Sequence, residues 1–142
     1  MGRGTQNEAI ARRLGADIYI DSAATDAAAE LQQLGGARVV LATAPSGKAM
    51  SSLVVGLGPS GTLVVIGASA DPIEVSTTLL ILGKRSIKGW SAGTPSDSED
   101  TLRFAESAGV RPMIEKLPLE KTREAYARMM GGDAHYRVVF TM

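Results

Sequence analysis

Two glycine-containing segments carry the residue types from which phosphate-binding loops are built. Residues 56–61 have the spacing G-x-G-x-x-G, and residues 42–49 approach the spacing G-x-x-x-x-G-K-[ST]. Both loops bind phosphate where the chain leaves a strand and opens a helix, because the helix amides then face the ligand. Residues 56–61 instead leave a helical stretch and enter a strand, and Pro59 has no backbone donor. This segment is therefore predicted to be a plain turn.

Residues 42–49 have the right context for a phosphate loop but lack two of its functional residues. Ala42 stands where the first glycine is needed. Ala49 stands where a hydroxyl side chain would bind Mg²⁺. We interpret the segment as a turn between a strand and a helix, with Lys48 in solvent, and not as a site of nucleotide hydrolysis.

Composition excludes several classes of protein. Of the 142 residues, 44% are hydrophobic and 4% aromatic, so we expect one domain with a core of small and aliphatic side chains. The formal net charge is zero, which argues against a nucleic-acid partner. No apolar run reaches the roughly 20 residues that span a bilayer, so no membrane partner is expected. We expect a cytoplasmic location. With no cysteine, the one histidine (His135) cannot complete a familiar zinc set, and a surface or packing role is favoured.

Two matched apolar runs, residues 38–44 and 62–68, are separated by a helical stretch at 46–57. Continuous apolar runs are typical of strands that are covered on both faces. The order strand, helix, strand predicts a parallel sheet and hence an α/β fold. Both runs end in small residues, and ligands of such sheets bind at the carboxyl ends of the strands.

The remaining elements follow from periodicity and capping residues. Helices are predicted at 7–14, 25–34 (capped by Thr25 or Asp26), 77–82, 96–108 and 119–130. Strands are predicted at 18–20, 86–90, 113–117 and 136–141, and residues 73–75 are predicted to be extended. Residues 96–99 read as a capping box opened by Ser96.

Arg137 stands in the otherwise apolar closing strand. An inward-facing arginine would need an anion or a carboxylate as partner. Side alternation leaves a solvent-facing arginine equally open.

In their order and spacing, these segments resemble the cofactor domain of medium-chain, zinc-type alcohol dehydrogenases. The resemblance is carried by residues 8–17, 58–67, 86–89 and 136–139. It implies an incomplete Rossmann-like, doubly wound parallel sheet with helices on both faces, so that residues 1–142 form a partial dinucleotide-binding domain. That fold has strand order 3-2-1-4-5-6, with its glycine loop after strand 1. The chain matches from the end of strand 2 onward, so the first strands and the catalytic domain with its zinc ligands are expected to be absent.

The resemblance also implies where a nicotinamide dinucleotide would be contacted. The implied contacts are Thr43, Ala44 and Pro45 after strand 4, Ile66, Gly67 and Ala68 after strand 5, Ser91 and Ala92 against the carboxamide, and Arg137 at the pyrophosphate. Gly2 occupies the position of the acidic residue that binds the ribose hydroxyls of NAD, and Arg3 follows it. This pair favours NADP over NAD, bound weakly without the glycine loop. No catalytic residue and no metal ligand is assigned to this chain.

Two hypotheses of different classes follow. In the first, the chain is a fragment of an NAD(P)-dependent alcohol or aldehyde oxidoreductase, inactive by itself, whose zinc belongs to the absent catalytic domain. In the second, it is a non-catalytic binding or self-association module derived from that fold. In either case the unpaired sheet edges at residues 39–42 and 86–90 predict a homo-oligomer.

Overall fold

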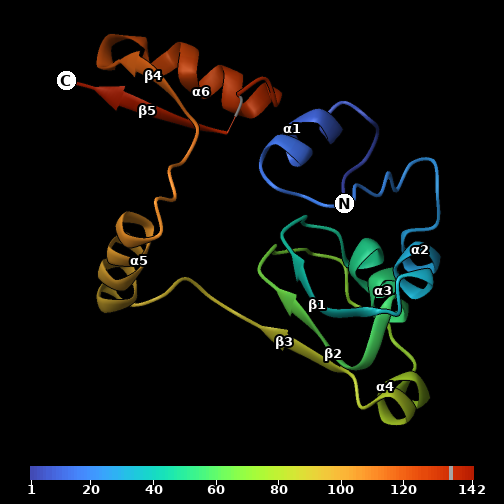
Figure 1. Cartoon of the computed structure of the whole chain (residues 1–142). Helices are drawn as coiled ribbons and strands as arrows, with labels where there is room; N and C mark the ends of the chain where they lie inside the picture. Colours follow the sequence, from blue (N-terminus) through green and yellow to red (C-terminus); the bar gives the residue numbers. More distant parts are fainter. Residues whose placement is uncertain (135) are drawn as a thin grey trace. The chain divides into compact units, whose positions relative to one another are not determined.

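The computed structural model describes residues 1–134 and 136–142, which form two compact units, Met1–Ser91 and Ala92–Met142 (Figure 1). His135, for which the sequence favoured a surface or packing role, lies outside the described residues. Among the helices of the described chain, none has the length and apolar character needed to cross a membrane.

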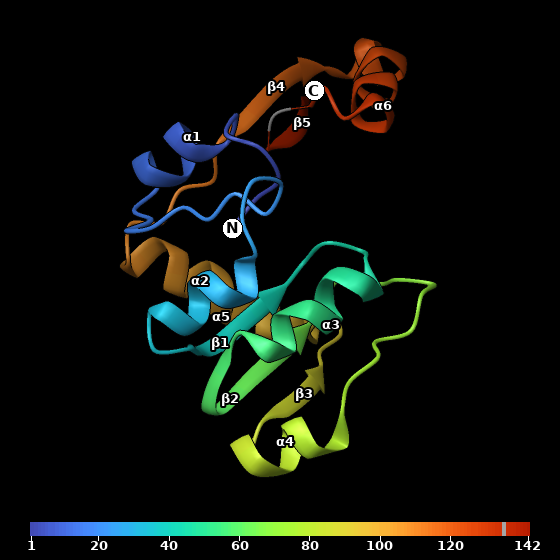
Figure 2. The same cartoon turned by 90° about the vertical axis from the view of Figure 1, so that its right-hand side faces the viewer.

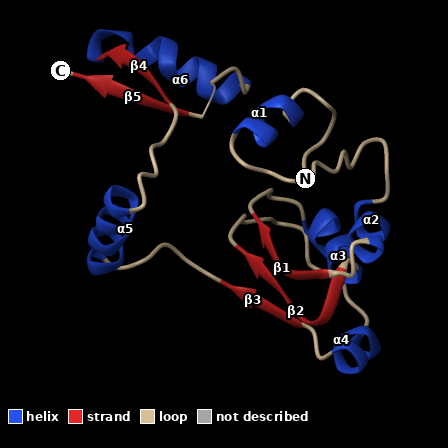
Figure 3. Cartoon of the chain, viewed as in Figure 1, coloured by secondary structure: helices blue, strands red, loops and turns tan. Residues whose placement is uncertain are grey.

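The first unit contains a parallel sheet with strand order β1-β2-β3 (Figure 3). Its elements are α1 (Glu8–Arg13), α2 (Ala27–Gln33), β1 (Ala37–Ala42), α3 (Gly47–Val55), β2 (Leu57–Val65), α4 (Thr77–Gly83) and β3 (Ser86–Gly89). Val40 pairs with Leu63, and Leu63 pairs with Ile87 on the next strand. The parallel βαβ arrangement predicted from the two matched apolar runs is confirmed.

The core of this unit lies on one face of the sheet. Val40, Ala42 and Leu63 from the strands are buried against Met50 and Val54 of α3. Side chains of α2 and α4 pack against the same cluster, and Figure 2 shows α3 lying along the strands. The connections from β1 to β2 and from β2 to β3 run in the same direction across the sheet. Because such crossovers are right-handed, they place their helices on the same face.

The opposite face of β1 is open within this unit. Val39 is 59% exposed and Leu41 is 58% exposed. The continuous apolar run therefore does not mean burial on both faces here, and β1 alternates between buried and exposed positions. An incomplete doubly wound sheet gives this pattern, because the helices on its second face come from crossovers that run in the other direction.

Three local predictions are refined by the structure. Asp26, not Thr25, caps α2, and its carboxylate accepts the amides of Ala28 and Ala29 at 2.9 and 3.3 Å. Residues 18–20 do not form a strand, since the only pairing nearby in the described chain is a single bridge between Gly2 and Asp21. Residues 73–75, predicted to be extended, belong to no strand. Their apolar side chains pack against the core instead.

The glycine-rich segment at residues 56–61 ends α3 and forms the irregular start of β2. Ala37 pairs with Leu57, but Val39 pairs with Thr62, so the register jumps within this segment. Ser60 has a φ of 58°, in the left-handed region. The segment therefore leaves a helix and enters a strand, which confirms that it is not a strand-to-helix phosphate loop, although it is a strand irregularity and not a free turn.

The second unit is a smaller βαβ arrangement preceded by a helix. Its elements are α5 (Pro95–Ser107), β4 (Ile114–Pro118), the 3-10 helix η1 (Leu119–Lys121), α6 (Thr122–Gly131) and β5 (Arg137–Thr141). β4 and β5 are parallel neighbours. Arg128 of α6 forms an ion pair of 2.8 Å with Glu115 of β4, and Ala125 is buried. The helix is thereby fixed against its own two strands.

The start of α5 differs from the prediction that Ser96 opens a capping box. The capping residue is Thr94, whose hydroxyl accepts the amide of Asp97 at 3.3 Å, while the Asp97 carboxylate accepts the amide of Thr94 at 2.6 Å. Pro95 at the first helical position fixes this start, because its ring suits a position whose amide needs no partner. Hydrogen bonds from the backbone and hydroxyl of Thr94 lower the pKa of Asp97 from its ordinary 3.8. The ionised Asp97 carboxylate therefore stabilises the start of α5 fully at a pH above its ordinary pKa. This stabilisation is lost as the pH falls through the lowered pKa of the folded chain.

Candidate functional site

The carboxyl ends of β1 and β2 meet at one edge of the sheet. The amides of Ile66 and Gly67 both donate to the carbonyl of Ala42, at 3.0 and 2.9 Å. The end of β2 is thereby held against the end of β1. Thr43, Ala44 and Pro45, the predicted contact residues after β1, are all exposed at this edge.

Gly67 makes the closest approach between the two strand ends. A Cβ at this position would lie 2.6 Å from the carbonyl oxygen of Thr43 and 2.8 Å from that of Ala44. Only a glycine fits this contact without moving the backbone. The structure thus brings together Thr43, Ala44 and Gly67, while Ile66 and Ala68 beside them are exposed.

The end of β3 adds a third segment to this edge. The amide of Trp90 donates to the carbonyl of Val65 at 3.0 Å, which holds Trp90, the residue before Ser91, beside the end of β2. The Lys88 ammonium lies 5.1 Å from the centroid of the Trp90 ring, a cation–π distance. Three neighbouring parallel strands therefore each contribute predicted contact residues to one edge, which is where ligands of such sheets bind.

The start of α3 lies beside this edge and is covered by the loop after β2. Ser46 caps the helix by accepting the amide of Ala49 at 3.3 Å. The hydroxyl of Ser69 accepts the amides of Gly47 and Asp71, each at 3.1 Å. A Cβ at Gly47 would lie 2.4 Å from the carbonyl oxygen of Pro72.

Sequence reasoning did not identify Gly47 or Ser69 as parts of this arrangement. The contact joins residues more than twenty positions apart, and the glycine in the predicted strand-to-helix turn is its only signal in the sequence. Lys48 is exposed, as predicted.

Arg3 lies in the loop at residues 2–4 of the same unit, beside the bridge between Gly2 and Asp21. Its side chain is exposed. Within the part of the chain that the structure describes, no group forms a hydrogen bond or an ion pair with its guanidinium. The charge is therefore available to a ligand.

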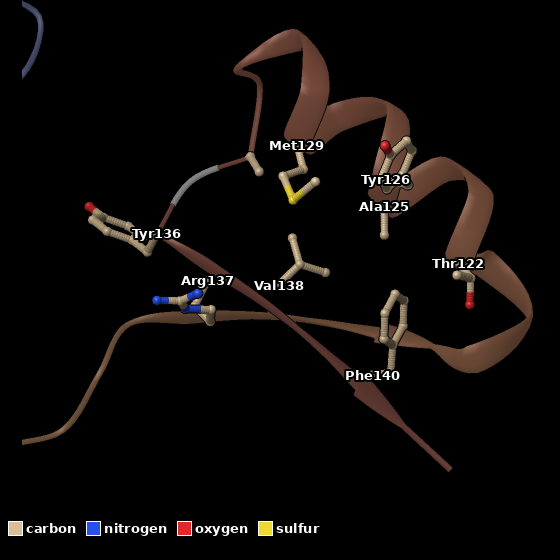
Figure 4. A pocket seen from close by; sticks show the side chains of 9 residues that line it. Thr122, Ala125, Tyr126, Met129, Tyr136, Arg137, Val138 and Phe140 are labelled. Atoms are coloured by element: carbon tan, nitrogen blue, oxygen red, sulfur yellow. The ribbon is translucent and has the colours of Figure 1, made fainter. Parts of the chain in front are cut away.

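Ala92 and Arg137 belong to the second unit. Arg137 begins β5 and is exposed, which settles the alternative that side alternation left open. A groove of about 250 Å³ lies between α6 and β5. It is lined by Thr122, Ala125, Tyr126, Met129, Ala134, Tyr136, Arg137, Val138 and Phe140. Figure 4 shows Val138 and Phe140 pointing toward Met129 and Tyr126 of the helix, with Arg137 at one end.

The residues of the strand-end edge fit part of a dinucleotide. Small exposed residues at three strand ends leave room for a ring and a ribose. In the described residues the β1-to-α3 turn contains Pro45 in place of a glycine-rich phosphate cradle. Among the described residues, no group of three or more histidine, cysteine or acidic side chains lies close enough together to hold a metal ion. The edge therefore fits the ring and ribose better than it fits the pyrophosphate or a metal.

Comparison with known proteins identifies the family. The profile described as "Zinc-binding dehydrogenase" matches residues 2–107. The chain belongs to this family, the medium-chain zinc-type alcohol dehydrogenases, and represents part of their cofactor-binding domain.

Individual relatives agree with this assignment. The chain is 42% identical over its whole length to the alcohol dehydrogenase notN of Aspergillus sp. (strain MF297-2) and, equally, to the alcohol dehydrogenase patD of Penicillium expansum. In both comparisons it covers 42% of the relative, so it spans about two fifths of the length of these curated proteins.

Solved structures show the same fold. The alcohol dehydrogenase of Aeropyrum pernix superposes with a TM-score of 0.84 at 21% identity, over 99% of this chain and 41% of that one. An alcohol dehydrogenase zinc-binding domain protein of Burkholderia ambifaria gives a TM-score of 0.82 at 25% identity, over 94% of this chain and 39% of that one. The predicted class, an incomplete doubly wound α/β fold, is confirmed.

Proposed function

We propose that this chain supplies part of the nicotinamide dinucleotide site of an NAD(P)-dependent alcohol or aldehyde oxidoreductase. The observation that carries the proposal is the edge at which β1, β2 and β3 end together, with Gly67 against the Thr43 carbonyl. Membership of the zinc-binding dehydrogenase family supports it. The whole enzyme's reaction would be hydride transfer between substrate and cofactor, chemistry that the nicotinamide itself provides.

In this proposal the chain's own residues bind and orient. Thr43, Ala44 and Pro45 would contact the nicotinamide ribose and ring from the end of β1. Ile66, Gly67 and Ala68 would do so from the end of β2, and Ser91 and Ala92 would contact the carboxamide. Polarisation of the substrate by zinc is assigned to the parts of the whole enzyme that this chain, about two fifths of its curated relatives' length, does not span.

The two arginines are proposed to contact phosphate. Arg3 follows Gly2 where an acidic residue would select the ribose hydroxyls of NAD, so we assign NADP as the preferred cofactor. Arg137 is assigned to the pyrophosphate, because its planar guanidinium can form paired hydrogen bonds to phosphate oxygens.

Calorimetric titration of the chain with NADPH and NADH tests these assignments. We expect weak binding that favours NADPH. Arg3→Ala should reduce the affinity for NADPH more than that for NADH, and Arg137→Ala should reduce both. Each loss is expected to be about 1.5–3 kcal/mol, the contribution of a charge-assisted hydrogen bond. Arg111→Ala, which removes an arginine with no assigned role, is the control. Equal affinity for NADH and NADPH in the unmodified chain would remove the role of Arg3, and an Arg137→Ala variant with unchanged affinity would remove that of Arg137.

Self-association, which the non-catalytic alternative requires and the first hypothesis also allows, is supported by one feature of the first unit. β1 and β3 are the edges of its sheet, and Val39 and Leu41 are exposed on an open face of β1. Unpaired edges and exposed apolar strands recruit further strands. We expect light scattering to give the mass of a dimer or larger homo-oligomer. The measurement is made at tens of micromolar, on the order of the concentrations at which stable interfaces hold. A stable monomer at this concentration would contradict self-association.

A further inference from the structure

The loop at residues 2–4 is fixed by its neighbours at both of its glycines. The amide of Gly2 donates to the carbonyl of Ile20 at 3.1 Å, and the carbonyl of Gly2 accepts the amide of Ser22 at 2.9 Å. The amide of Gly4 donates to the carboxylate of Asp21 at 2.6 Å. Gly4 has a φ of +80°, in the left-handed region that favours glycine. Arg3, between them, is therefore presented from a constrained backbone.

Tyr19 occupies the space beside Gly2. Its hydroxyl donates to the carbonyl of Gly4 at 2.7 Å. A Cβ on Gly2 would lie 2.3 Å from that hydroxyl oxygen and 3.1 Å from the Cζ atom of the ring. A side chain at position 2 would therefore force the ring away and break its hydrogen bond to Gly4. Ile20, the next residue, is buried and anchors this segment.

The chemistry at this loop depends on which charge it presents. An acidic side chain at position 2 would accept hydrogen bonds from ribose hydroxyls and would repel a phosphate on the same ribose. The exposed guanidinium of Arg3, with no partner among the described residues, would attract that phosphate. Whether the loop prefers ribose hydroxyls or a phosphorylated ribose therefore depends on the residue that occupies the space beside position 2, which is Tyr19.

We infer that Tyr19 is a specificity-determining positioning residue. It excludes a side chain at position 2 and holds the loop that presents Arg3, so that the loop selects a phosphorylated ribose. This inference rests on the proposed function. It assigns the selection to a residue that does not itself contact the ligand, and it explains why the position carries glycine.

The test uses two probes that differ only in one phosphate, adenosine 2′,5′-bisphosphate and adenosine 5′-monophosphate. Affinities are measured by calorimetry for the unmodified chain and for Gly2→Asp, Tyr19→Ala and the double variant. We expect the unmodified chain to prefer the bisphosphate by roughly tenfold or more. Gly2→Asp alone should weaken both probes, because the loop is displaced. The double variant should recover binding of the monophosphate and lose the preference, because the aspartate then has room. Phe104→Ala, which removes an exposed aromatic side chain of α5, should leave the ratio unchanged.

A readout independent of ligand follows the loop itself. In the absence of probe, the amide resonance of Gly4, which is bonded to Asp21 and Tyr19, should shift in Gly2→Asp and in Tyr19→Ala but not in Phe104→Ala. The inference is wrong if Gly2→Asp alone reverses the preference with the loop resonances unmoved, or if Tyr19→Ala with Gly2→Asp behaves as Gly2→Asp alone. Absence of binding of either probe to the unmodified chain would instead overturn the proposed function and, with it, this inference.

Discussion

Gly36→Ala is expected to lower the free energy of unfolding by about 2–4 kcal/mol. Gly36 joins α2 to β1 with a φ of +82°, which an alanine adopts only with strain. A Cβ there would also lie 2.5 Å from the Cα and 2.6 Å from the amide nitrogen of Gly58. These are backbone atoms at the irregular start of β2, so they cannot rotate away. The cost is measured by urea unfolding followed through Trp90, the chain's one tryptophan, which belongs to the first unit.

Gly35→Ala is the matched control. Gly35 has a φ of +94°, but a Cβ there would meet nothing within 4 Å. It should therefore show only the backbone cost, about 1 kcal/mol. Equal destabilisation of the two variants would show that Gly36 and Gly58 are not in close contact in solution. The backbone would then enter β2 by a different path from the one described.

Leu63→Ala is expected to cost about 2–5 kcal/mol. Leu63 is fully buried on β2, the central strand of the sheet, between Val40 and Ile87 on the neighbouring strands. Truncation would leave a cavity in a core built from few large side chains, and the surrounding strands and α3 can close it only in part. The same urea experiment measures the loss.

Leu41→Ala removes the same side chain from the adjacent strand, on the opposite face. Because Leu41 is 58% exposed, the change should be within about 0.5 kcal/mol. A cost comparable to that of Leu63→Ala would show that something covers this face of β1 in solution. Combined with light scattering, this result would distinguish an open face from one buried by self-association.

The parts of the fold that could be predicted are those that local sequence patterns indicate. The apolar runs around Val40 and Leu63, separated by a helical stretch, predicted the parallel βαβ unit, and the periodicity of residues 119–130 predicted the helix of the second one. Capping was predicted less well. Asp26 is one of two candidates for α2. The predicted cap Ser96 is wrong for α5, because Pro95 suits the first helical position and Thr94 before it is the cap.

The parts that could not be predicted depend on contacts between distant segments. An apolar run cannot show whether both faces of a strand have cover, since this depends on the direction of every crossover in the sheet. The hydroxyl of Tyr19 beside Gly2 and that of Ser69 on the amide of Gly47 are visible only once the chain has folded. The candidate contact residues came from resemblance, and their roles toward a cofactor stay predictions.

The most direct test of the central claim is to map NADPH binding residue by residue, by following backbone amide resonances during a titration of the full chain. The largest changes are predicted at Ala44, Gly67 and Ala68, where the strand ends meet, with a second group at Arg3 and its neighbours. Gly89→Ala, at a position where a Cβ meets nothing within 4 Å, should leave these resonance changes as they are. Gly67→Ala should reduce the changes at the strand ends. Saturable changes that spare residues 43–45 and 66–68, or no changes at millimolar NADPH (on the order of the weakest specific affinities), would contradict a dinucleotide site at this edge.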